Sequence, residues 1–395
     1  MAGPLEGIRV LDLTRILAGP YATMLLGDLG AEVIKIEQPG TGDESRNFGP
    51  FKNDFSLYFM SVNRGKKSLT LNLKSPRGIE LFLELVKGSD ILVENFRPGT
   101  MQKLGLDYES LKSHCPSLIY AACSGFGQTG PDANRGAYDM IIQGLGGIIS
   151  ITGEPGRPPV RVGTSISDLT AAMFTTIGIL SALHHRHLTG EGQFVDVAML
   201  DGMVAILENA VVRYMLTGDI PQPLGARHPA ITPFEAFESA DGHVIIAIGN
   251  DGLWAKFCEH VNRPDLITDE RFRTNALRTT NHAELFPILS ELMRQRTTAE
   301  WMQALDAIGV PCGPINTIDK VVTHPQVLSR EMISIVEHEV TGSVQIPGLP
   351  IKLSKTPGQV DTPAPILGEH TDEILTELLG IEVTEVERLK RDGVV

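Results

Sequence analysis

Short apolar runs rich in β-branched residues alternate with helical patterns through the first half of the chain. Residues 20–30, 75–88 and 100–114 carry apolar positions at helical spacing. Between them, the alternation predicts strands at residues 8–13, 31–37, 67–73, 90–95 and 117–124. Because strands that alternate with helices are typical of a parallel sheet covered on both faces, we expect an α/β fold.

A long apolar helix, an apolar run at residues 192–200 and a second helix near 201–216 come next. The pattern of apolar and polar residues changes after about residue 216. Residues 217–229 are rich in Gly and Pro and lack a period, which predicts a linker. Beyond it we expect a hairpin around Asp241-Gly242 and helices from about 252 to 308. A second hairpin is predicted around Thr341-Gly342, and an amphipathic stretch at 370–380 precedes a short tail.

The composition restricts the class of protein. A chain of 395 residues is long enough for two domains, and 42% hydrophobic with 21% charged residues is ordinary for a soluble protein. A net charge of −14 argues against nucleic-acid binding. The four cysteines form no C-x-x-C pair, so neither a disulfide framework nor a thiolate metal site is expected. Without a signal-peptide pattern or a membrane span, we expect a cytoplasmic protein that binds no membrane.

Two other motifs give little evidence of dinucleotide or metal binding. Residues 125–130, GFGQTG, match G-x-G-x-x-G after a predicted strand, but residues 131–134 separate the last glycine from the next helical pattern. A dinucleotide fingerprint requires the glycines to open the helix directly, so dinucleotide binding is not expected. Residues 184–187, HHRH, are better explained as the polar end of a helix than as a metal site.

Two carboxylates, Asp139 and Asp168, each begin an apolar helical pattern directly after a glycine-containing loop. Asp168 heads the run from Leu169 to Leu183. One interpretation is that Asp168 caps a helix N-terminus. The other is that it is a reacting group, since helix N-termini stabilise negative charge beside an electrophile. The local pattern leaves both interpretations open.

A set of stretches in consistent order, from about residue 5 to residue 380, resembles the class III CoA-transferases. They include LDLTRILAGPYATMLLGDLGAEVIKIEQPG, VNRGKKSLTLNLKSPRG, LVENFRPGTMQKLGLDY, SGFGQTGP, GAYDMIIQGLGG and SDLTAAMFTTIGILSALHHRHLTGEGQFVDVAMLDG. This is the family of formyl-CoA transferase, carnitine CoA-transferase and succinyl-CoA:glutarate CoA-transferase. The resemblance implies a Rossmann-like large domain built from both chain ends, 1–216 and 332–395. It also implies an inserted smaller α+β domain at 225–330, with linkers on either side, and an interlocked homodimer.

The resemblance also implies a reaction. CoA moves from an acyl-CoA, such as succinyl-CoA, to a small carboxylic acid, with no tightly bound cofactor and no metal. Asp168 matches the nucleophile of the family and carries anhydride and aspartyl-CoA thioester intermediates, with Tyr138 and Asp139 as supporting residues. The dipole of the helix is expected to keep Asp168 ionised.

Binding residues carry over by position. Those matching CoA contacts are Arg15, Ile16, Leu17, Ala18, Leu71, Asn72, Lys74, Asn95, Phe96, Arg97 and Lys103. Candidates for binding the acid are Arg64, Arg227 and His228. Leu17 and Gln38 stand where formyl-CoA transferase has a glutamine and an arginine, and its glycine-rich tetrad is absent. Residues 61–67 and 224–237 instead look like the glutarate branch, so we expect a dicarboxylate.

Two alternatives use the same fold or pocket. An α-methylacyl-CoA racemase needs bases on both sides of the α-carbon. In that enzyme a histidine precedes the loop aspartate, where this chain has Tyr138, and a second base, a glutamate, falls near Asn250. A non-catalytic acyl-CoA binding protein would use the pocket without any chemistry at Asp168. Measuring CoA exchange between an acyl-CoA and a free acid separates the three.

Overall fold

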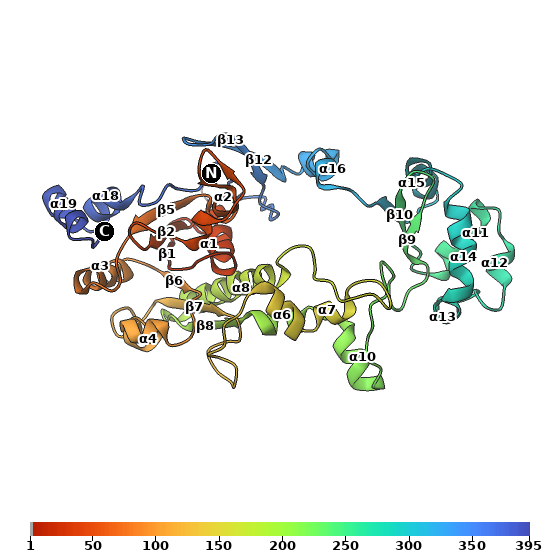
Figure 1. Ribbon diagram of the computed structural model, residues 1–395, viewed down its shortest axis with the longest axis horizontal. Helices are drawn as coiled ribbons and strands as arrows, with labels where there is room; N and C mark the ends of the chain where they lie inside the picture. The colour runs from red at the N-terminus through yellow and green to blue at the C-terminus, as the bar shows by residue number, and fades with distance from the viewer. Residues whose placement is uncertain (1–2) are drawn as a thin grey trace. The chain divides into compact units, whose positions relative to one another are not determined.

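The computed structural model describes residues 3–395, which form two compact units (Figure 1). One unit comprises the chain up to Ile148 together with Arg161–Thr217 and Pro325–Val395. The other comprises Ile149–Val160 and Gly218–His324. Residues 149–160, assigned to the large domain from the sequence, therefore group with the second unit, and residues 325–330, assigned to the inserted domain, group with the first.

The first unit is organised around a six-stranded parallel sheet with the order β5-β2-β1-β6-β7-β8. Its strands are β1 (Arg9–Asp12), β2 (Glu32–Glu37), β5 (Lys66–Thr70), β6 (Ile91–Glu94), β7 (Ile119–Ser124) and β8 (Phe194–Ala198). The α/β class with a parallel sheet is confirmed. Since β2 and β6 lie on opposite sides of β1, the order of the strands reverses between β1 and β6, which is where ligands bind in open α/β sheets.

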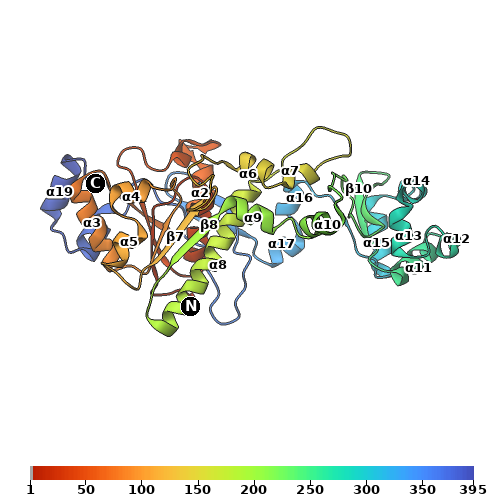
Figure 2. The same cartoon turned by 90° about the horizontal axis from the view of Figure 1, so that it is seen from below.

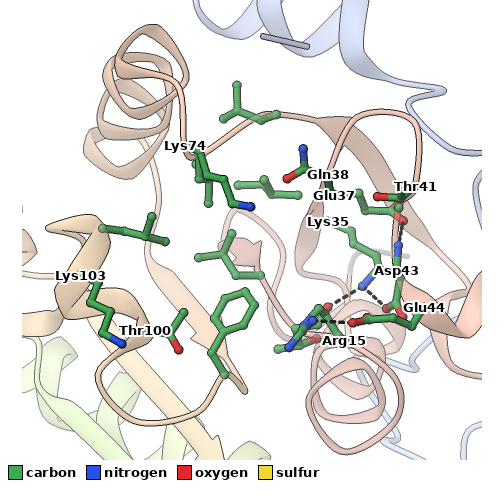
Figure 3. A pocket seen from close by; sticks show the side chains of 18 of the residues that line it. Arg15, Lys35, Glu37, Gln38, Thr41, Asp43, Glu44, Lys74, Thr100 and Lys103 are labelled. Atoms are coloured by element: carbon green, nitrogen blue, oxygen red, sulfur yellow. Dashed lines mark hydrogen bonds and ion pairs between the residues drawn. The ribbon is translucent and has the colours of Figure 1, made fainter. Parts of the chain in front are cut away.

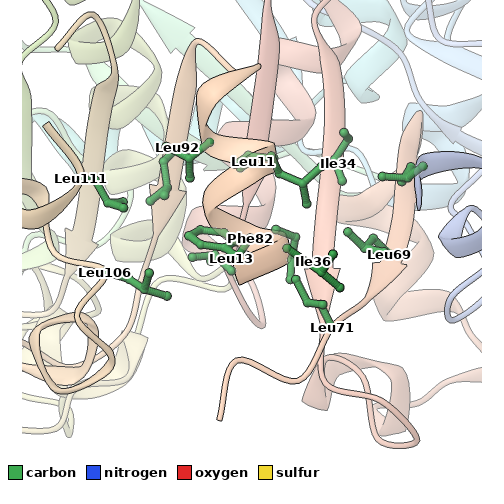
Figure 4. Close-up of a cluster of buried hydrophobic side chains, with 14 of the residues drawn as sticks. Leu11, Leu13, Ile34, Ile36, Leu69, Leu71, Phe82, Leu92, Leu106 and Leu111 are labelled. Carbon is green, nitrogen blue, oxygen red and sulfur yellow. The ribbon is translucent and has the colours of Figure 1, made fainter. Parts of the chain in front are cut away.

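Both faces of the sheet are covered, as the alternation of its side chains requires. Leu11 of β1 packs with Phe82 of α3 (Pro76–Lys87), in the cluster of leucine and isoleucine side chains that Figure 4 shows. Val10, one residue earlier, packs on the other face with Leu26 of α1 (Ala18–Asp28) and Ile179 of α8 (Ile166–Thr189). The sheet is thus buried from both sides.

Helix α8 is the helix within residues 3–395 whose length and apolar composition would allow it to cross a membrane. It runs alongside β7 and β8 (Figure 2) and also packs against α1. Ala171, Ala172 and Ile179 are fully buried. A core helix of a globular domain has this composition too.

Several predicted helices differ in their bounds. The 100–114 helix divides into α4 (Thr100–Leu104) and α5 (Tyr108–Lys112), because Gly105 adopts a left-handed φ of 70° and ends the first. The 201–216 helix divides into α9 (Met199–Ala205) and α10 (Asn209–Thr217) around Glu208, whose φ is 48°. The expected tail contains α19 (Val383–Arg391), which buries Val386 and Leu389.

The remaining elements of the first unit are short. They are η1 (Glu44–Asn47), β3 (Phe51–Lys52), β4 (Phe55–Ser56), α2 (Leu57–Asn63), α6 (Asp139–Leu145), α17 (Pro325–Ser329), β12 (Ile333–His338), β13 (Gly342–Pro347), α18 (Thr371–Glu373) and the π-helical η2 (Ile374–Leu378). Strands β12 and β13 pair antiparallel, so the hairpin predicted around Thr341-Gly342 is confirmed. Helix α7 (Ile148–Ile151) lies where the chain passes from one unit to the other.

The second unit has its own core, in which Trp254 and Trp301 are both buried. Its antiparallel sheet has the order β11-β10-β9, with β9 (Phe234–Glu238), β10 (His243–Ala247) and β11 (Cys312–Pro314). The hairpin predicted around Asp241-Gly242 is confirmed. The helices are α11 (Asp251–His260), α12 (Asp265–Thr268), α13 (Asn275–Thr280), α14 (His282–Met293), α15 (Thr298–Ala307) and α16 (Ile318–Val322).

Candidate active site

The loops that follow β1 and β6 are joined where the strand order reverses. The backbone N–H of Arg15 donates to Asn95 Oδ1 at 2.8 Å, and Asn95 Nδ2 donates to the Arg15 carbonyl at 2.8 Å. The Arg15 guanidinium also lies over the Phe96 ring, 4.9 Å from its centroid. Two of the predicted binding segments, 15–18 and 95–97, therefore meet at the carboxyl end of the sheet.

Ile16 has an unusual backbone conformation, with a φ of 69° that β-branched residues rarely adopt. Its N–H donates to Asp43 Oδ1 at 3.1 Å, and Asp43 forms a buried ion pair of 2.9 Å with Lys35. Lys35 Nζ also donates to the Thr14 carbonyl at 2.7 Å. Burial alone would raise the pKa of Asp43, but Lys35 and the Ser45 N–H hold it below its usual range. The surrounding structure therefore fixes this strained turn.

A cavity of about 640 Å³, here called the outer cavity, opens beside this turn (Figure 3). Its apolar walls include Leu71, Leu73 and Phe96, and its cationic groups include Lys74 and Lys103. Within the described chain neither lysine forms an ion pair. An apolar cavity with two available ammonium groups suits a ligand with an aromatic ring and negative charges.

A second cavity of about 220 Å³, the inner cavity, contains Asp168 in its wall. It shares Arg15, Glu44 and Phe96 with the outer cavity. Nine of the residues predicted from the sequence line it: Arg15, Ile16, Leu17, Ala18, Asn95, Phe96, Arg97, Tyr138 and Asp168. The structure therefore brings a large part of the predicted site together along two neighbouring cavities.

Asp168 is not a helix cap, so that interpretation is wrong. Helix α8 begins at Ile166 with Ser165 in the capping position, and Asp168 lies within the first turn. No hydrogen-bond partner of its side chain is found among the described residues. Burial, and then the negative charge of Asp139, raise the pKa of Asp168 to about 7. Both effects oppose the stabilisation of the ionised carboxylate that was expected from the helix dipole.

The first turn of α8 is capped instead by Asp139, which is the first residue of α6. Its Oδ1 accepts from the backbone N–H of Ser167 at 3.1 Å and from the Ser167 hydroxyl at 2.8 Å. Its Oδ2 accepts from Gln143 Nε2 at 2.8 Å and lies 3.7 Å from the Arg161 guanidinium. Asp139 thus fixes the turn that carries Asp168.

Two predicted residues of the first unit are held away from the cavities. The buried Arg64 guanidinium forms a bidentate ion pair with Asp28, at 2.6 and 3.0 Å, and also donates to the Pro347 carbonyl. Its donors are therefore occupied, and the acid-binding role expected for it loses its support. The Asn72 side chain bonds the Gly393 carbonyl and the Lys74 N–H, so it stabilises its own turn.

The other acid-binding candidates lie in the second unit. Arg227 Nη2 donates to the Thr279 carbonyl at 3.3 Å. The His228 ring stacks on Phe234 with centroids 5.3 Å apart, and its Nδ1 accepts from the Ala230 N–H. Both side chains make contacts within that unit, and their acid-binding role stays a prediction.

Sequence reasoning missed three residues beside Asp168. Ser124 and Glu44 line the inner cavity, and Tyr58 on α2 has its pKa raised by burial and by the charge of Asp168. A local signal existed for Ser124, which ends a predicted strand directly before the glycines of residues 125–130. No local signal marked Glu44 or Tyr58.

Comparison with known proteins gives a consistent result. Residues 5–371 match the model of CoA-transferase family III. The chain is 42% identical over 393 residues to succinyl-CoA:glutarate CoA-transferase of Mus musculus, covering 99% of this chain and 90% of the relative. It is 45% identical over 353 residues to acetyl-CoA:oxalate CoA-transferase of Acetobacter aceti, covering 89% and 90%. A CAIB/BAIF family protein from Brucella suis has a similar structure, with a TM-score of 0.85, 41% identity, and coverage of 96% and 100%.

Proposed function

The chain belongs to CoA-transferase family III, and on this premise we propose that it moves CoA from a dicarboxylic acyl-CoA to a free dicarboxylic acid. One observation carries the proposal. The half-buried carboxyl of Asp168, without a hydrogen-bond partner in the described chain, lines an inner cavity that adjoins a larger cavity with two available lysines. A nucleophile at the inner end and cations at the outer end suit an acyl-CoA, which has a thioester at one end and phosphates at the other.

The outer cavity would hold the nucleotide part of CoA. The lysine ammonium groups of Lys74 and Lys103 would bind its phosphates, and Leu71 and Phe96 offer apolar surface to the adenine. The pantetheine arm would pass Arg15 and Phe96, which line both cavities. The thioester then reaches Asp168.

The chemistry on Asp168 would proceed through covalent intermediates. A carboxylate oxygen of Asp168 attacks the thioester carbonyl, the C–S bond breaks, and CoA leaves as a thiolate with an aspartyl-acyl anhydride behind. The thiolate attacks the aspartyl carbonyl, which releases the donor acid and forms an aspartyl-CoA thioester. The acceptor acid reverses these steps. Because one thioester replaces another, the exchange needs no external energy source.

The choice of a dicarboxylate rests on the relatives. The two curated relatives carry glutarate and oxalate in their names, and both acids have two carboxyl groups. Arg15, Arg97 and Arg135 line the inner cavity and supply positive charge for an acid. Since the Arg15 guanidinium already pairs with Glu44 and the Arg135 guanidinium with Asp132, Arg97 is the better candidate for the second carboxylate.

We also propose that two chains assemble as a homodimer through the first unit. Large apolar side chains are exposed on four of its helices: Met140, Ile141 and Leu145 on α6, Met173, Phe174 and Ile177 on α8, Val204 on α9, and Val212, Met215 and Leu216 on α10. An exposed apolar surface of this extent is typical of a protein–protein interface. Light scattering should give twice the 42.9 kDa of one chain, and a lone chain at micromolar concentration would contradict the dimer.

A panel of acids tests the function. The purified protein is mixed with succinyl-CoA and oxalate, glutarate or adipate, with acetate and butyrate as monocarboxylate controls. New acyl-CoA is measured by chromatography, and the dicarboxylates should react much faster than the controls. An absence of exchange with every acid would overturn the proposal. Deuterium uptake from D₂O at the α-carbon without exchange would instead indicate a racemase.

A further inference from the structure

Ser124 is a buried residue whose hydroxyl forms no hydrogen bond with the rest of the described chain. It ends β7, is 6% exposed, and its Oγ has no hydrogen-bond partner among residues 3–395. Almost all buried polar groups in proteins have a partner, so an exception calls for an explanation. Ser124 is among the residues that line the inner cavity together with Asp168.

Two other polar side chains of the inner cavity hold the loops of the site. The Asn95 amide bonds the backbone of Arg15, and the Arg15 guanidinium pairs with Glu44. The neighbouring Cys123 is buried, which raises the pKa of its thiol to about 12 and keeps it neutral. Ser124 is therefore a strong neutral donor in this wall that the protein itself does not use.

We propose that the Ser124 hydroxyl is a catalytic hydrogen-bond donor to the thioester carbonyl oxygen, which becomes negatively charged when Asp168 attacks. The inference rests on the proposed function, because it requires the covalent step at Asp168. In that step the bond between the Asp168 oxygen and the carbonyl carbon forms, and the C–S bond breaks with its electron pair going to sulfur. The Ser124 O–H bond stays intact throughout.

The lack of a hydrogen-bond partner for the Ser124 hydroxyl within residues 3–395 favours this role. A donor without a partner in the resting enzyme gives up no existing hydrogen bond when charge develops on the substrate. Its position at the carboxyl end of a parallel strand is where α/β folds place reacting groups. The same hydroxyl can serve the last step, in which the CoA thiolate attacks the acyl carbonyl of the acceptor anhydride and charge develops on the corresponding oxygen.

Thr175 offers a matched control. It is also a buried hydroxyl, lies on α8 in the turns that follow Asp168, and contacts Cys123, but it is not part of the inner-cavity wall. Ser124→Ala and Thr175→Val each remove one hydroxyl from the same region. Neither change is expected to lower the thermal melting temperature, because each exchanges a buried hydroxyl for an apolar group.

The experiment measures succinyl-CoA:glutarate exchange and the rate at which succinyl-CoA acylates the enzyme in the absence of an acceptor. Ser124→Ala should lower kcat and the acylation rate about 100-fold, with KM for succinyl-CoA little changed. Thr175→Val should stay within about twofold of the wild type. A Ser124→Ala variant with the wild-type rate, or an equal loss in Thr175→Val, overturns the proposal for Ser124.

The two proposals fail in different ways. If the wild-type protein is not acylated on Asp168 at all, the proposed function is wrong and the role of Ser124 fails with it. If the wild type is acylated and Ser124→Ala is acylated equally fast, only the role of Ser124 is wrong. A rise in KM without a fall in kcat also overturns it, because the hydroxyl would then bind the substrate without stabilising the transition state.

Discussion

Asp139 accepts hydrogen bonds from both the backbone N–H and the hydroxyl of Ser167, at 3.1 and 2.8 Å, directly before Asp168 in the chain. A carboxylate from α6 therefore caps the first turn of α8. The same contact holds a negative charge close to Asp168, whose pKa burial and Asp139 together raise to about 7. The pKa of Asp168 thus depends on its burial and, in part, on a charge from a neighbouring helix.

Replacing Asp139 with Asn should shift the pH dependence of acylation. In the wild type the acylation rate should rise with pH through about 7, because only the ionised Asp168 attacks. The Asn variant keeps an acceptor for Ser167 but removes the charge, so this rise should move to lower pH. Single-turnover acylation measured from pH 5 to 9 tests the shift. Glu191→Gln, an exposed carboxylate beyond the far end of α8, is the control, and an unmoved profile in Asp139→Asn would contradict the coupling.

Replacing Asp168 with Asn should stabilise the folded protein at alkaline pH. Between 3.8 and about 7 the unfolded chain loses the Asp168 proton while the folded chain keeps it, so wild-type stability falls as pH rises through this window. Because Asn does not ionise, the stability of the variant does not fall in this way. At pH 8 the free energy of unfolding of the variant should exceed that of the wild type by at most about 4 kcal/mol, and by about 1–2 kcal/mol once solvent screening is allowed for. The two proteins should converge below about pH 4, and a less stable variant at pH 8 would show that the ionised carboxylate stabilises the fold.

Removing the outer lysines should weaken the binding of acyl-CoA. Lys74→Ala and Lys103→Ala each delete one charge-assisted hydrogen bond to a phosphate, worth about 1.5–3 kcal/mol, which corresponds to about 10- to 150-fold in KM for acyl-CoA. The KM for the acceptor acid and kcat should change little. Lys112→Ala, an exposed lysine on α5 outside the outer cavity, serves as the control. Unchanged KM values in both Lys74→Ala and Lys103→Ala would show that the CoA phosphates do not bind in the outer cavity.

Arg64 should prove to be structural. Arg64→Ala leaves Asp28 buried without its ion-pair partner, and breaking such a pair costs about 3–5 kcal/mol. Urea unfolding should therefore show a large loss of stability, whereas the KM for the acid in the folded fraction should stay near the wild-type value. A selective rise of that KM with unchanged stability would restore the acid-binding role.

The strands could be predicted from the sequence because their signals are local, whereas the local pattern only marked Asp168 and its role as a nucleophile came from the family resemblance. A run such as residues 31–37 is apolar and β-branched over the length of one strand, and Asp168 directly precedes an apolar helical run. The division of the 100–114 helix at Gly105 also had a local signal that was not used. In each case a few consecutive residues carry the information.

The electrostatics of the site could not be predicted in this way. Asp139 and Ser167 are separated by 28 positions, and Arg64 and Asp28 by 36. Their pairing depends on how α6 meets α8 and on how α2 ends beside α1, which the local pattern does not contain. Asp168 was expected to be stabilised by the dipole of its own helix, whereas burial and a residue of another helix raise its pKa.

Mass spectrometry of the acylated protein tests the central claim most directly. The wild type is incubated with succinyl-CoA and no acceptor, digested, and compared with Asp168→Asn treated in the same way. We predict a succinyl or CoA adduct on the peptide that contains Asp168, removed by hydroxylamine, and no adduct on the variant, with exchange lowered by several orders of magnitude. An Asp168→Asn variant that exchanges CoA at nearly the wild-type rate, or an adduct on a different residue, would contradict the account.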